Sequence, residues 1–251
     1  MTKFASKKYK ILYEDSGCAV INKPAGVLVH NLPERVSDTT IAAWWLGQPD
    51  TEKNIWPVAG REGIVHRLDR DTTGALLLAR NPEALNKLQK QFHDRTVKKY
   101  YLALVFGKPA KNEGEIESVI SRQPKERTKR KASIIDFGGL SDAKKAITAY
   151  RLIGSVKYKE SDISLIRFEI KTGRTHQVRL HAKMLGCPIL GDRDYATKPS
   201  KRLSDKLGVE RQMLHARELV FQSPENKRKV RVKAPLCDDM VRILAQLGLN
   251  N

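Results

Sequence analysis

Two aspartates, two arginines and one histidine crowd into the stretch from His66 to Asp71. A Thr-Thr-Gly turn follows, and then an uninterrupted apolar run to Ala79 that is typical of a buried strand. A carboxylate taken partly out of water needs cationic or hydrogen-bonding partners, so the cluster is either a structural ion-pair network or a working site. The residues of this stretch leave both interpretations open.

A second polar patch lies between residues 171 and 186, where a glycine turn precedes a predicted helix that ends at Gly186. His176, Arg179 and Lys183 have the spacing of side chains that share one helical face. The sequence therefore predicts a basic helical face in the second half of the chain.

A third group of polar residues falls on a predicted strand at residues 97–106. Because side chains alternate along a strand, Lys99 and Tyr101 are expected on one face and Tyr100 on the other. A tyrosine in a strand serves packing in most proteins. Lys99 and Tyr101 are therefore candidate functional residues only in combination with the other two polar patches.

Metal binding would leave a ligand spacing that the sequence does not have. His176 and His181 lie five residues apart, His66 has no histidine or cysteine nearby, and neither a His-Glu-x-x-His nor a Cys-x-x-Cys motif is present. A glycine-rich phosphate loop is also absent from the sequence. We therefore expect no metal and no cofactor, and we interpret the three widely spaced cysteines as small buried hydrophobic residues.

The charge of the chain points to a polyanionic partner. Lys and Arg number 47 against 28 Asp and Glu, a formal net charge of +19 over 251 residues. Nucleic acid is the first expectation. The sequence has no long apolar span, no basic helix with a continuous apolar face and no signal-peptide core, so we expect a soluble cytoplasmic protein that does not bind membranes.

Short β-rich segments with scattered helices predict an α+β fold, because strands and helices do not alternate as they do in a doubly wound sheet. The basic run at residues 122–131 contains Pro124 and is interpreted as a loop. Asp38 and Asn81 are expected to cap helices. The elements are predicted as strands at 9–13, 18–21, 27–29, 75–79, 97–106, 116–120, 146–153, 164–170, 213–221 and 229–232, and as helices at 39–46, after Asn81, within 171–186 and at 238–247.

Asp69, Asp71 and Thr73 form an Asp-x-Asp-x-Thr pattern that resembles the nucleophile motif of haloacid-dehalogenase-type phosphatases. Residues 191–194 loosely resemble the Mg²⁺-binding segment of those enzymes. In that family an apolar strand precedes the first aspartate, whereas here the longest apolar run follows it. A Mg²⁺-dependent phosphatase using Asp69 and Asp71 is therefore kept as an alternative.

The stretch from His66 to Gly74 resembles more closely the signature of RluA-type pseudouridine synthases, in which His-Arg-Leu-Asp precedes a Thr-Ser-Gly-like turn. Further segments are similar to blocks of that family, in the same order, and the resemblance covers about Tyr13 to Pro235. These segments are residues 23–26, 99–103, 172–181, 186–192 with Tyr195, and 214–216.

The resemblance implies a single α+β pseudouridine-synthase-like domain with a mixed, mostly antiparallel sheet, flanking helices and a central cleft. Residues 1–12 are expected to be an N-terminal extension and 13–251 the catalytic domain, without a separate N-terminal RNA-binding domain. The implied reaction is isomerisation of a uridine in structured rRNA or tRNA by a monomer. A non-catalytic RNA-binding protein of the same fold is the alternative of another class.

The family's catalytic residues correspond to Asp69, Tyr101 and Arg179. Asp69 would act as a nucleophile at C1′ or at C6 of uracil, or would assist glycal formation, and Arg179 would pair with it. Tyr101 would stack on uracil and serve as a base. Arg67 would fill the gap left by the extruded base or, in a purely structural role, pair with Asp71.

The remaining candidate residues follow from the same resemblance. RNA contacts are expected from Arg70, Lys99, Arg174, His176 and Gln177 and from the basic segments 125–131 and 198–202. For His176 and Gln177 the alternative is hydrogen bonding to backbone groups at the start of the helix. A supporting role is expected for His66, Asp71, Thr73 and Gly74. Apolar walls of the pocket are expected from Ile166, Val178 and Leu180.

Overall fold

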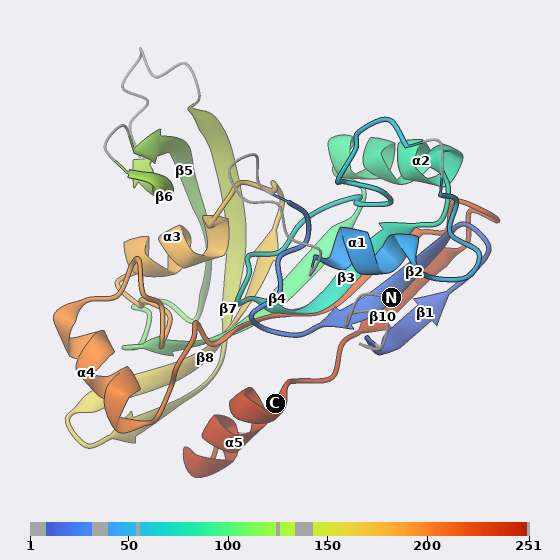
Figure 1. The fold of residues 1–251 in the computed structure, drawn as a ribbon. Helices are drawn as coiled ribbons and strands as arrows, with labels where there is room; N and C mark the ends of the chain where they lie inside the picture. The colour runs from blue at the N-terminus through green and yellow to red at the C-terminus, as the bar shows by residue number, and fades with distance from the viewer. Residues whose placement is uncertain (1–8, 32–39, 54–55, 124–125, 134–142, 250–251) are drawn as a thin grey trace. The chain divides into compact units, whose positions relative to one another are not determined.

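The structure, a computed structural model, describes residues 9–31, 40–53, 56–123, 126–133 and 143–249, with the side chains of 122–133 left aside. Within these residues the chain forms ten strands and five helices (Figure 1). The strands are β1 (Ile11–Glu14), β2 (Cys18–Lys23), β3 (Thr73–Ala79), β4 (Lys98–Phe106), β5 (Glu113–Gln123), β6 (Glu126–Ser133), β7 (Lys144–Tyr158), β8 (Ser161–Ile170), β9 (Leu214–Gln222) and β10 (Lys229–Lys233). The helices are α1 (Ile41–Leu46), α2 (Pro82–His93), α3 (Gln177–Met184), α4 (Lys198–Lys206) and α5 (Asp238–Gln246).

The elements group into two compact units. Unit 1 comprises Met1–Lys98 and Ala216–Pro235, and unit 2 comprises Lys99–His215 and Leu236–Asn251. The chain passes between the units at three points, after Lys98 in β4, after His215 in β9 and after Pro235, which follows β10. No change of composition marks the first two points, because the residues on both sides belong to continuous strands. The predicted domain boundaries at residues 12 and 13 stay a prediction.

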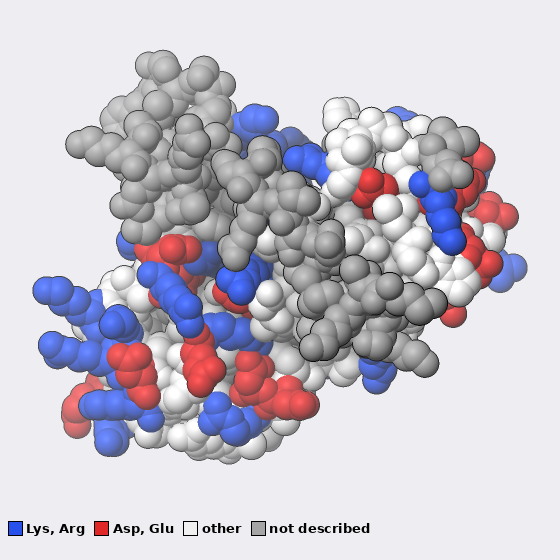
Figure 2. Space-filling view, viewed as in Figure 1, with Lys and Arg blue, Asp and Glu red and all other residues white. Residues whose placement is uncertain are grey.

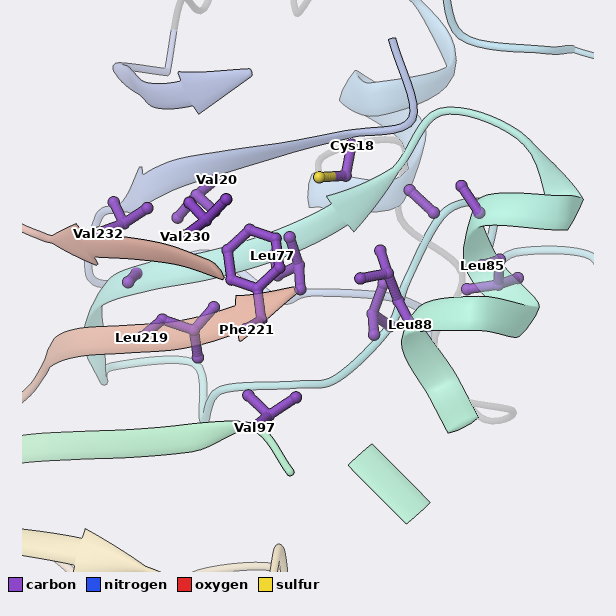
Figure 3. Close-up of a cluster of buried hydrophobic side chains, with 14 of the residues drawn as sticks. Cys18, Val20, Leu77, Leu85, Leu88, Val97, Leu219, Phe221, Val230 and Val232 are labelled. Atoms are coloured by element: carbon purple, nitrogen blue, oxygen red, sulfur yellow. The ribbon is translucent and has the colours of Figure 1, made fainter. Parts of the chain in front are cut away.

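Unit 1 is built on antiparallel strand pairs. β2 pairs with β1 and β3, and β10 pairs with β9. One face of these strands packs against α2, where Leu85 and Leu88 meet Leu77 of β3 and Phe221 of β9 (Figure 3). Each apolar side chain removed from water in this way contributes roughly 1.5–3 kcal/mol to stability. The central polar stretch thus ends in the strand β3, every residue of which is buried.

Unit 2 contains the strand order β4-β8-β7-β5-β6, in which each neighbouring pair is antiparallel. The helices α4 and α5 contribute Leu203, Leu207, Ile243 and Leu244 to a cluster with Leu104 and other buried residues of β4 and β8. Leu180 of α3 packs with residues of β5 and β7. The first cluster holds α4 and α5 against β4, the strand that carries Tyr101, and against β8. The second holds α3, the helix that carries Arg179, against β5 and β7.

Several local predictions need correction. Residues 27–29 are not a strand, because the carbonyls of Leu28 and Val29 accept hydrogen bonds from Ile41 and Ala42 at the start of α1. Thr40 caps α1 by accepting from the Ala43 amide, whereas Asp38 lies outside the described residues. Asn81 caps α2 as predicted, with Pro82 in its first turn.

The basic run at 122–131 was interpreted as a loop, yet β5 extends to Gln123 and β6 begins at Glu126. Pairing between these two strands provides backbone hydrogen bonds that outweigh the charge of the run. The helix α4 was also not predicted. Its signal is a capping box in which Thr197 and Ser200 exchange hydrogen bonds, with Pro199 in the first turn.

The α+β class and the predominance of antiparallel pairing are confirmed. The predicted central cleft stays a prediction. Cys18 and Cys187 are buried and Cys237 is half-buried, and all three are free thiols. Among the described residues no helix has the length and apolarity needed to cross a membrane.

Candidate active site

Lys23 organises the turn that carries Asp69. It is completely buried at the end of β2, where it lies opposite Gly74 of β3. Its ammonium donates to the carbonyl oxygens of Pro24, Arg70 and Thr72 at 2.9, 2.8 and 3.0 Å. An ammonium group has three N–H donors, so it can bind all three carbonyls at once. These hydrogen bonds hold the backbone on either side of Asp71 in place.

Asp69 itself is half-buried and begins this turn, because its carbonyl accepts the Thr72 amide at 3.1 Å. Gly74 closes the turn with a φ of +110°. A Cβ at this position would lie 2.3 Å from the Ala216 carbonyl oxygen of β9, so only glycine fits. The carboxylate of Asp69 therefore stands on a short, tightly determined piece of backbone.

His66 supports the same stretch from the other side. Its Nε2 accepts the Leu77 amide of β3 at 3.0 Å, and its ring stacks on Phe92 of α2 with centroids 4.8 Å apart. Thr73 is buried and Asp71 is half-buried. The supporting role expected for these three residues and for Gly74 stays a prediction.

The two arginines of the stretch are exposed and have different partners. Arg70 donates from Nε to the Gly26 carbonyl at 3.2 Å. Arg67 donates from an η nitrogen to Nε2 of His30 at 3.4 Å. The two interpretations of Arg67, a side chain that fills the gap of the extruded base and a salt bridge to Asp71, both stay predictions. His30 was not a candidate, and no sequence signal distinguishes it from other loop histidines.

Tyr101 and Lys99 lie on β4 in unit 2, with side chains that are 7% exposed in each case. Tyr101 pairs across the sheet with Phe168 of β8. Tyr100 points to the opposite face, where the Arg167 guanidinium lies 4.0 Å from its ring centroid. The predicted alternation along this strand is confirmed.

Arg179 of α3 is buried and held by two carboxylates. Its Nε and one η nitrogen donate to the two oxygens of Asp192, each at 2.7 Å, and the same η nitrogen donates to Asp194 at 2.6 Å. Asp192 is itself inaccessible and accepts the amides of Asp194 and Tyr195. The Tyr195 ring lies beneath the guanidinium, 5.0 Å from its centre. Both aspartates lie in segments that resemble known motifs, but nothing in the sequence indicates that they pair with Arg179.

The shared helical face predicted for His176, Arg179 and Lys183 is not formed. His176 precedes α3 with a φ of +59° and its Nδ1 lies 2.8 Å from the Tyr195 hydroxyl oxygen. Arg179 points inward, whereas Lys183 is exposed. His176 lies outside the helix, so its side chain does not follow the helical spacing of the other two residues.

Gln177 makes four hydrogen bonds within the protein. Its carbonyl oxygen accepts from Thr172 Oγ1 and the Arg174 amide, and its amide nitrogen donates to the Ile147 carbonyl and Thr148 Oγ1. Four hydrogen bonds exhaust a side-chain amide. Gln177 therefore joins the start of α3 to β7 and keeps no group for RNA in this arrangement.

Of the other candidates in unit 2, Arg174 is half-buried and donates from Nε to the Lys145 carbonyl at 3.1 Å. The predicted pocket walls Ile166, Val178 and Leu180 are all buried. Leu180 packs within the protein with Tyr195 and residues of β5 and β7. It is therefore a core residue.

Exposed basic side chains gather on α4 (Figure 2). Lys198, Lys201 and Arg202 share one outer stripe of this helix, while Ser200 and Leu203 face inward. The predicted basic segment 198–202 thus has the exposure that a phosphate-binding surface needs. The side chains of the other predicted segment, 125–131, lie outside the described residues.

The structure brings the site residues together in two sets. Asp69, Arg67, Arg70 and their supports belong to unit 1, and Tyr101, Lys99, Arg179 and the residues around α3 belong to unit 2. The proximity of Asp69 to Arg179 and Tyr101, which the resemblance implies, stays a prediction.

The Mg²⁺ segment proposed by the phosphatase alternative has another partner in this structure. Asp192 and Asp194, its carboxylates, are bound to Arg179. No cluster of three or more His, Cys, Asp or Glu residues suited to a metal ion occurs in the described part of the chain.

Comparison with known proteins agrees with this architecture. Residues 17–184 match the family model described as RNA pseudouridylate synthase. An uncharacterized RNA pseudouridine synthase of Synechocystis is 35% identical over 239 residues, which cover 94% of this chain and 68% of that protein. The ribosomal large subunit pseudouridine synthase D of Nitrosomonas europaea is 37% identical over 94% of this chain and 64% of its own length.

Among solved structures, human RNA pseudouridylate synthase domain containing 4 is similar, with a TM-score of 0.72 and 27% identity over 96% of this chain and 94% of that one. The chain thus belongs to the RNA pseudouridylate synthase family, and the predicted RluA-type resemblance is confirmed. It spans about two thirds of the length of the two bacterial relatives.

Proposed function

We propose that this protein isomerises a specific uridine in structured RNA to pseudouridine, with Asp69 as the nucleophile. The observation that carries the proposal is the construction around Asp69. A buried lysine, a glycine that admits no Cβ and a histidine bound to β3 determine the backbone of one half-buried carboxylate. Such preorganisation is what a reacting group requires, whereas a solvated surface charge gains nothing from it.

The reaction conserves all atoms. The bond between C1′ and N1 breaks, the uracil turns, C5 bonds to C1′, and the proton released from C5 is balanced by one gained at N1. Asp69 would form a transient bond at C1′ or C6, or would assist glycal formation, and Tyr101 would stack on the uracil and accept the C5 proton. No electron acceptor is consumed, so the chemistry needs only groups that the chain itself carries.

The carboxylates around Arg179 favour a role for this arginine at the reacting centre. Asp192 and Asp194 both form ion pairs with it, and Asp192 fixes the plane of its guanidinium through two parallel hydrogen bonds. A buried arginine that is already paired with carboxylates gains little by binding a phosphate. Its guanidinium is held in a defined plane, as pairing with the Asp69 carboxylate would require.

Reaction requires that the uridine leave its stack, at a cost of roughly a few kcal/mol. Arg67 suits the task of filling the gap, because it is exposed and directly precedes the Leu68-Asp69 segment. Its guanidinium can stack on neighbouring bases and donate to their edges. Arg67 would then assist extrusion of the uridine, and Asp69 would attack the extruded nucleotide.

The RNA itself is proposed from charge and from relatives. A net charge of +19 and the exposed stripe of α4 favour a folded polyanion, read by shape more than by sequence. Because several relatives are named as enzymes of the large ribosomal subunit, we place large-subunit rRNA ahead of tRNA as the substrate. Action in the cytoplasm on such RNA is part of the same proposal.

The test uses the full chain and unmodified RNA. Transcripts of the host's large-subunit rRNA and tRNAs are incubated with the protein in the presence of a metal chelator, and pseudouridines are then mapped chemically. New pseudouridine at one or a few positions is expected. A binding protein without activity would retain the RNA but leave it unmodified, and a phosphatase would release phosphate only when Mg²⁺ is added.

A further inference from the structure

His30 lies in the segment that follows β2, yet it is only 5% exposed. The two residues before it are fixed to the first turn of α1, because Leu28 and Val29 accept the amides of Ile41 and Ala42 at 3.0 and 2.9 Å. The imidazole is therefore carried on determined backbone, although it belongs to no helix or strand.

The hydrogen bonds of His30 define which nitrogen can accept. Nδ1 lies 2.7 Å from the Asn31 carbonyl oxygen, which can only accept, so Nδ1 carries the proton. Nε2 is then left with a lone pair, and it faces the Arg67 guanidinium at 3.4 Å. Burial lowers the pKa of His30, and the charges of Arg67 and Arg61 lower it further, whereas the bond to Asn31 acts in the opposite direction. All of these contacts suit a neutral ring.

The partner of the exposed Arg67 is a neutral imidazole and not a carboxylate, and the two kinds of partner have different consequences for RNA binding. A carboxylate would orient the guanidinium but would also cancel its charge and resist its movement. The imidazole orients one η nitrogen and leaves the positive charge intact for RNA. It also reduces the number of rotamers that the long side chain samples before binding, which lowers the entropy lost when the side chain is fixed.

We propose that His30 is a positioning residue that holds the Arg67 guanidinium ready for extrusion of the target uridine. This inference rests on the proposed function, because it assigns His30 a role in the same reaction. His30 does not touch the reacting atoms. It acts through Arg67, and its removal should therefore slow turnover without weakening RNA binding.

The experiment is a double-mutant cycle measured by loss of tritium from C5 of [5-³H]uridine in transcripts of the host's large-subunit rRNA and tRNAs. The variants are His30→Leu, Arg67→Met and their combination, with His30→Gln as the conservative replacement that restores an acceptor. RNA affinity is measured by filter retention, and thermal unfolding verifies that each variant is folded.

We expect His30→Leu to lower kcat about tenfold and to leave RNA affinity within about threefold of wild type, whereas His30→Gln recovers most of the rate. In the Arg67→Met background, His30→Leu should change the rate by less than about twofold, since a residue that acts through Arg67 has nothing left to position. If His30→Leu destabilises the fold, His30→Ala takes its place in the cycle at a temperature where the variant is folded, since it also removes the acceptor for Arg67.

Two results would overturn the inference. Effects of His30 and Arg67 that multiply would mean that the two residues act independently, and an unchanged rate in His30→Leu would mean that the contact has no role. Both leave the proposed function standing, because the wild-type protein still releases tritium. Absence of release by the wild type would instead reject the proposed function, and the role of His30 with it.

Discussion

Arg179 and Asp192 form a buried bidentate pair, in which two parallel N–H···O hydrogen bonds of 2.7 Å join the planar guanidinium to a carboxylate that is inaccessible to solvent. This geometry fixes both the position and the plane of the arginine. Arg179 comes from α3 and Asp192 from the turn-rich segment before α4, so the pair also joins two segments of unit 2.

We predict that Asp192→Asn lowers the free energy of unfolding by about 3 kcal/mol, because the amide replaces one acceptor with a donor and removes the buried one of the two carboxylates that pair with Arg179. Pseudouridine formation should fall more than about a hundredfold at a temperature where the variant is folded. Urea unfolding and a single-turnover assay measure the two effects.

Asp194→Asn is the matched control, since this side chain is 35% exposed and makes one contact with the same arginine. Its stability should change by less than about 1 kcal/mol. Equal losses in the two variants would mean that Asp192 does not orient Arg179.

Lys23→Met should be destabilising by about 3 kcal/mol, because three backbone carbonyls lose their donor inside the protein. Turnover should fall with it, since the turn that carries Asp69 loses its clamp. The control is Lys87→Met, which removes an exposed ion pair with Glu83 and should change stability by less than about 0.5 kcal/mol. Urea unfolding of both variants is the measurement, and similar midpoints would contradict the clamp.

Gly74→Ala should unfold the start of β3 or the whole of unit 1, because the new Cβ meets backbone atoms of Ala216 that cannot move aside. We expect a loss of more than about 3 kcal/mol. Gly173→Ala is the comparison, since a Cβ there meets nothing within 4 Å and the backbone has no positive φ. Thermal unfolding separates the two, and a Gly74→Ala protein as stable as Gly173→Ala would refute the close approach.

The strands and caps that local chemistry determines were predictable from the sequence. The apolar run after Gly74 became β3, Asn81 with Pro82 began α2, and the alternation around Tyr101 gave β4. The sequence did not predict the structure of residues 27–29 or of the basic run at 122–131. The structure of both segments depends on which backbone partner lies beside them. Hydropathy and charge of a segment carry no information about that partner.

Some features of the candidate site were likewise predictable from the sequence and others were not. The motif around Asp69 and the position of Arg179 could be found from residue types in order along the chain. The contacts of Lys23, Asp192 and His30 could not, since each joins residues that lie far apart in sequence or that have no distinctive spacing. Arg179 was expected to pair with Asp69, and the carboxylates of Asp192 and Asp194 are the partners that the sequence left unassigned.

His181 gives the protein a predicted weakness in acid. It is inaccessible to solvent, its Nε2 lies 2.8 Å from Ser118 Oγ, and burial lowers its pKa to about 4. An unfolded histidine has a pKa of about 6.5, so as the pH falls the unfolded state takes up the proton first. This contribution to stability is complete above pH 6.5 and is lost between pH 6.5 and pH 4.

The loss should amount to about 2 to 3 kcal/mol between pH 7.5 and pH 4.5. It is isolated by comparing wild type with His181→Leu, in which the other titrating groups are retained. Urea unfolding at the two pH values should give a smaller decrease for the variant. Equal decreases would mean that another group, and not His181, controls the acid limb.

The central claim is that the Asp69 carboxylate reacts with the uridine. It is tested most directly by mapping pseudouridine in unmodified large-subunit rRNA after treatment with wild type and with Asp69→Asn, which keeps the size of the side chain and removes its nucleophilic charge. We expect the variant to bind the RNA with an affinity within about threefold of wild type and to form pseudouridine at least about 1,000-fold more slowly. Modification of the same uridine by Asp69→Asn at a rate near that of wild type would contradict it.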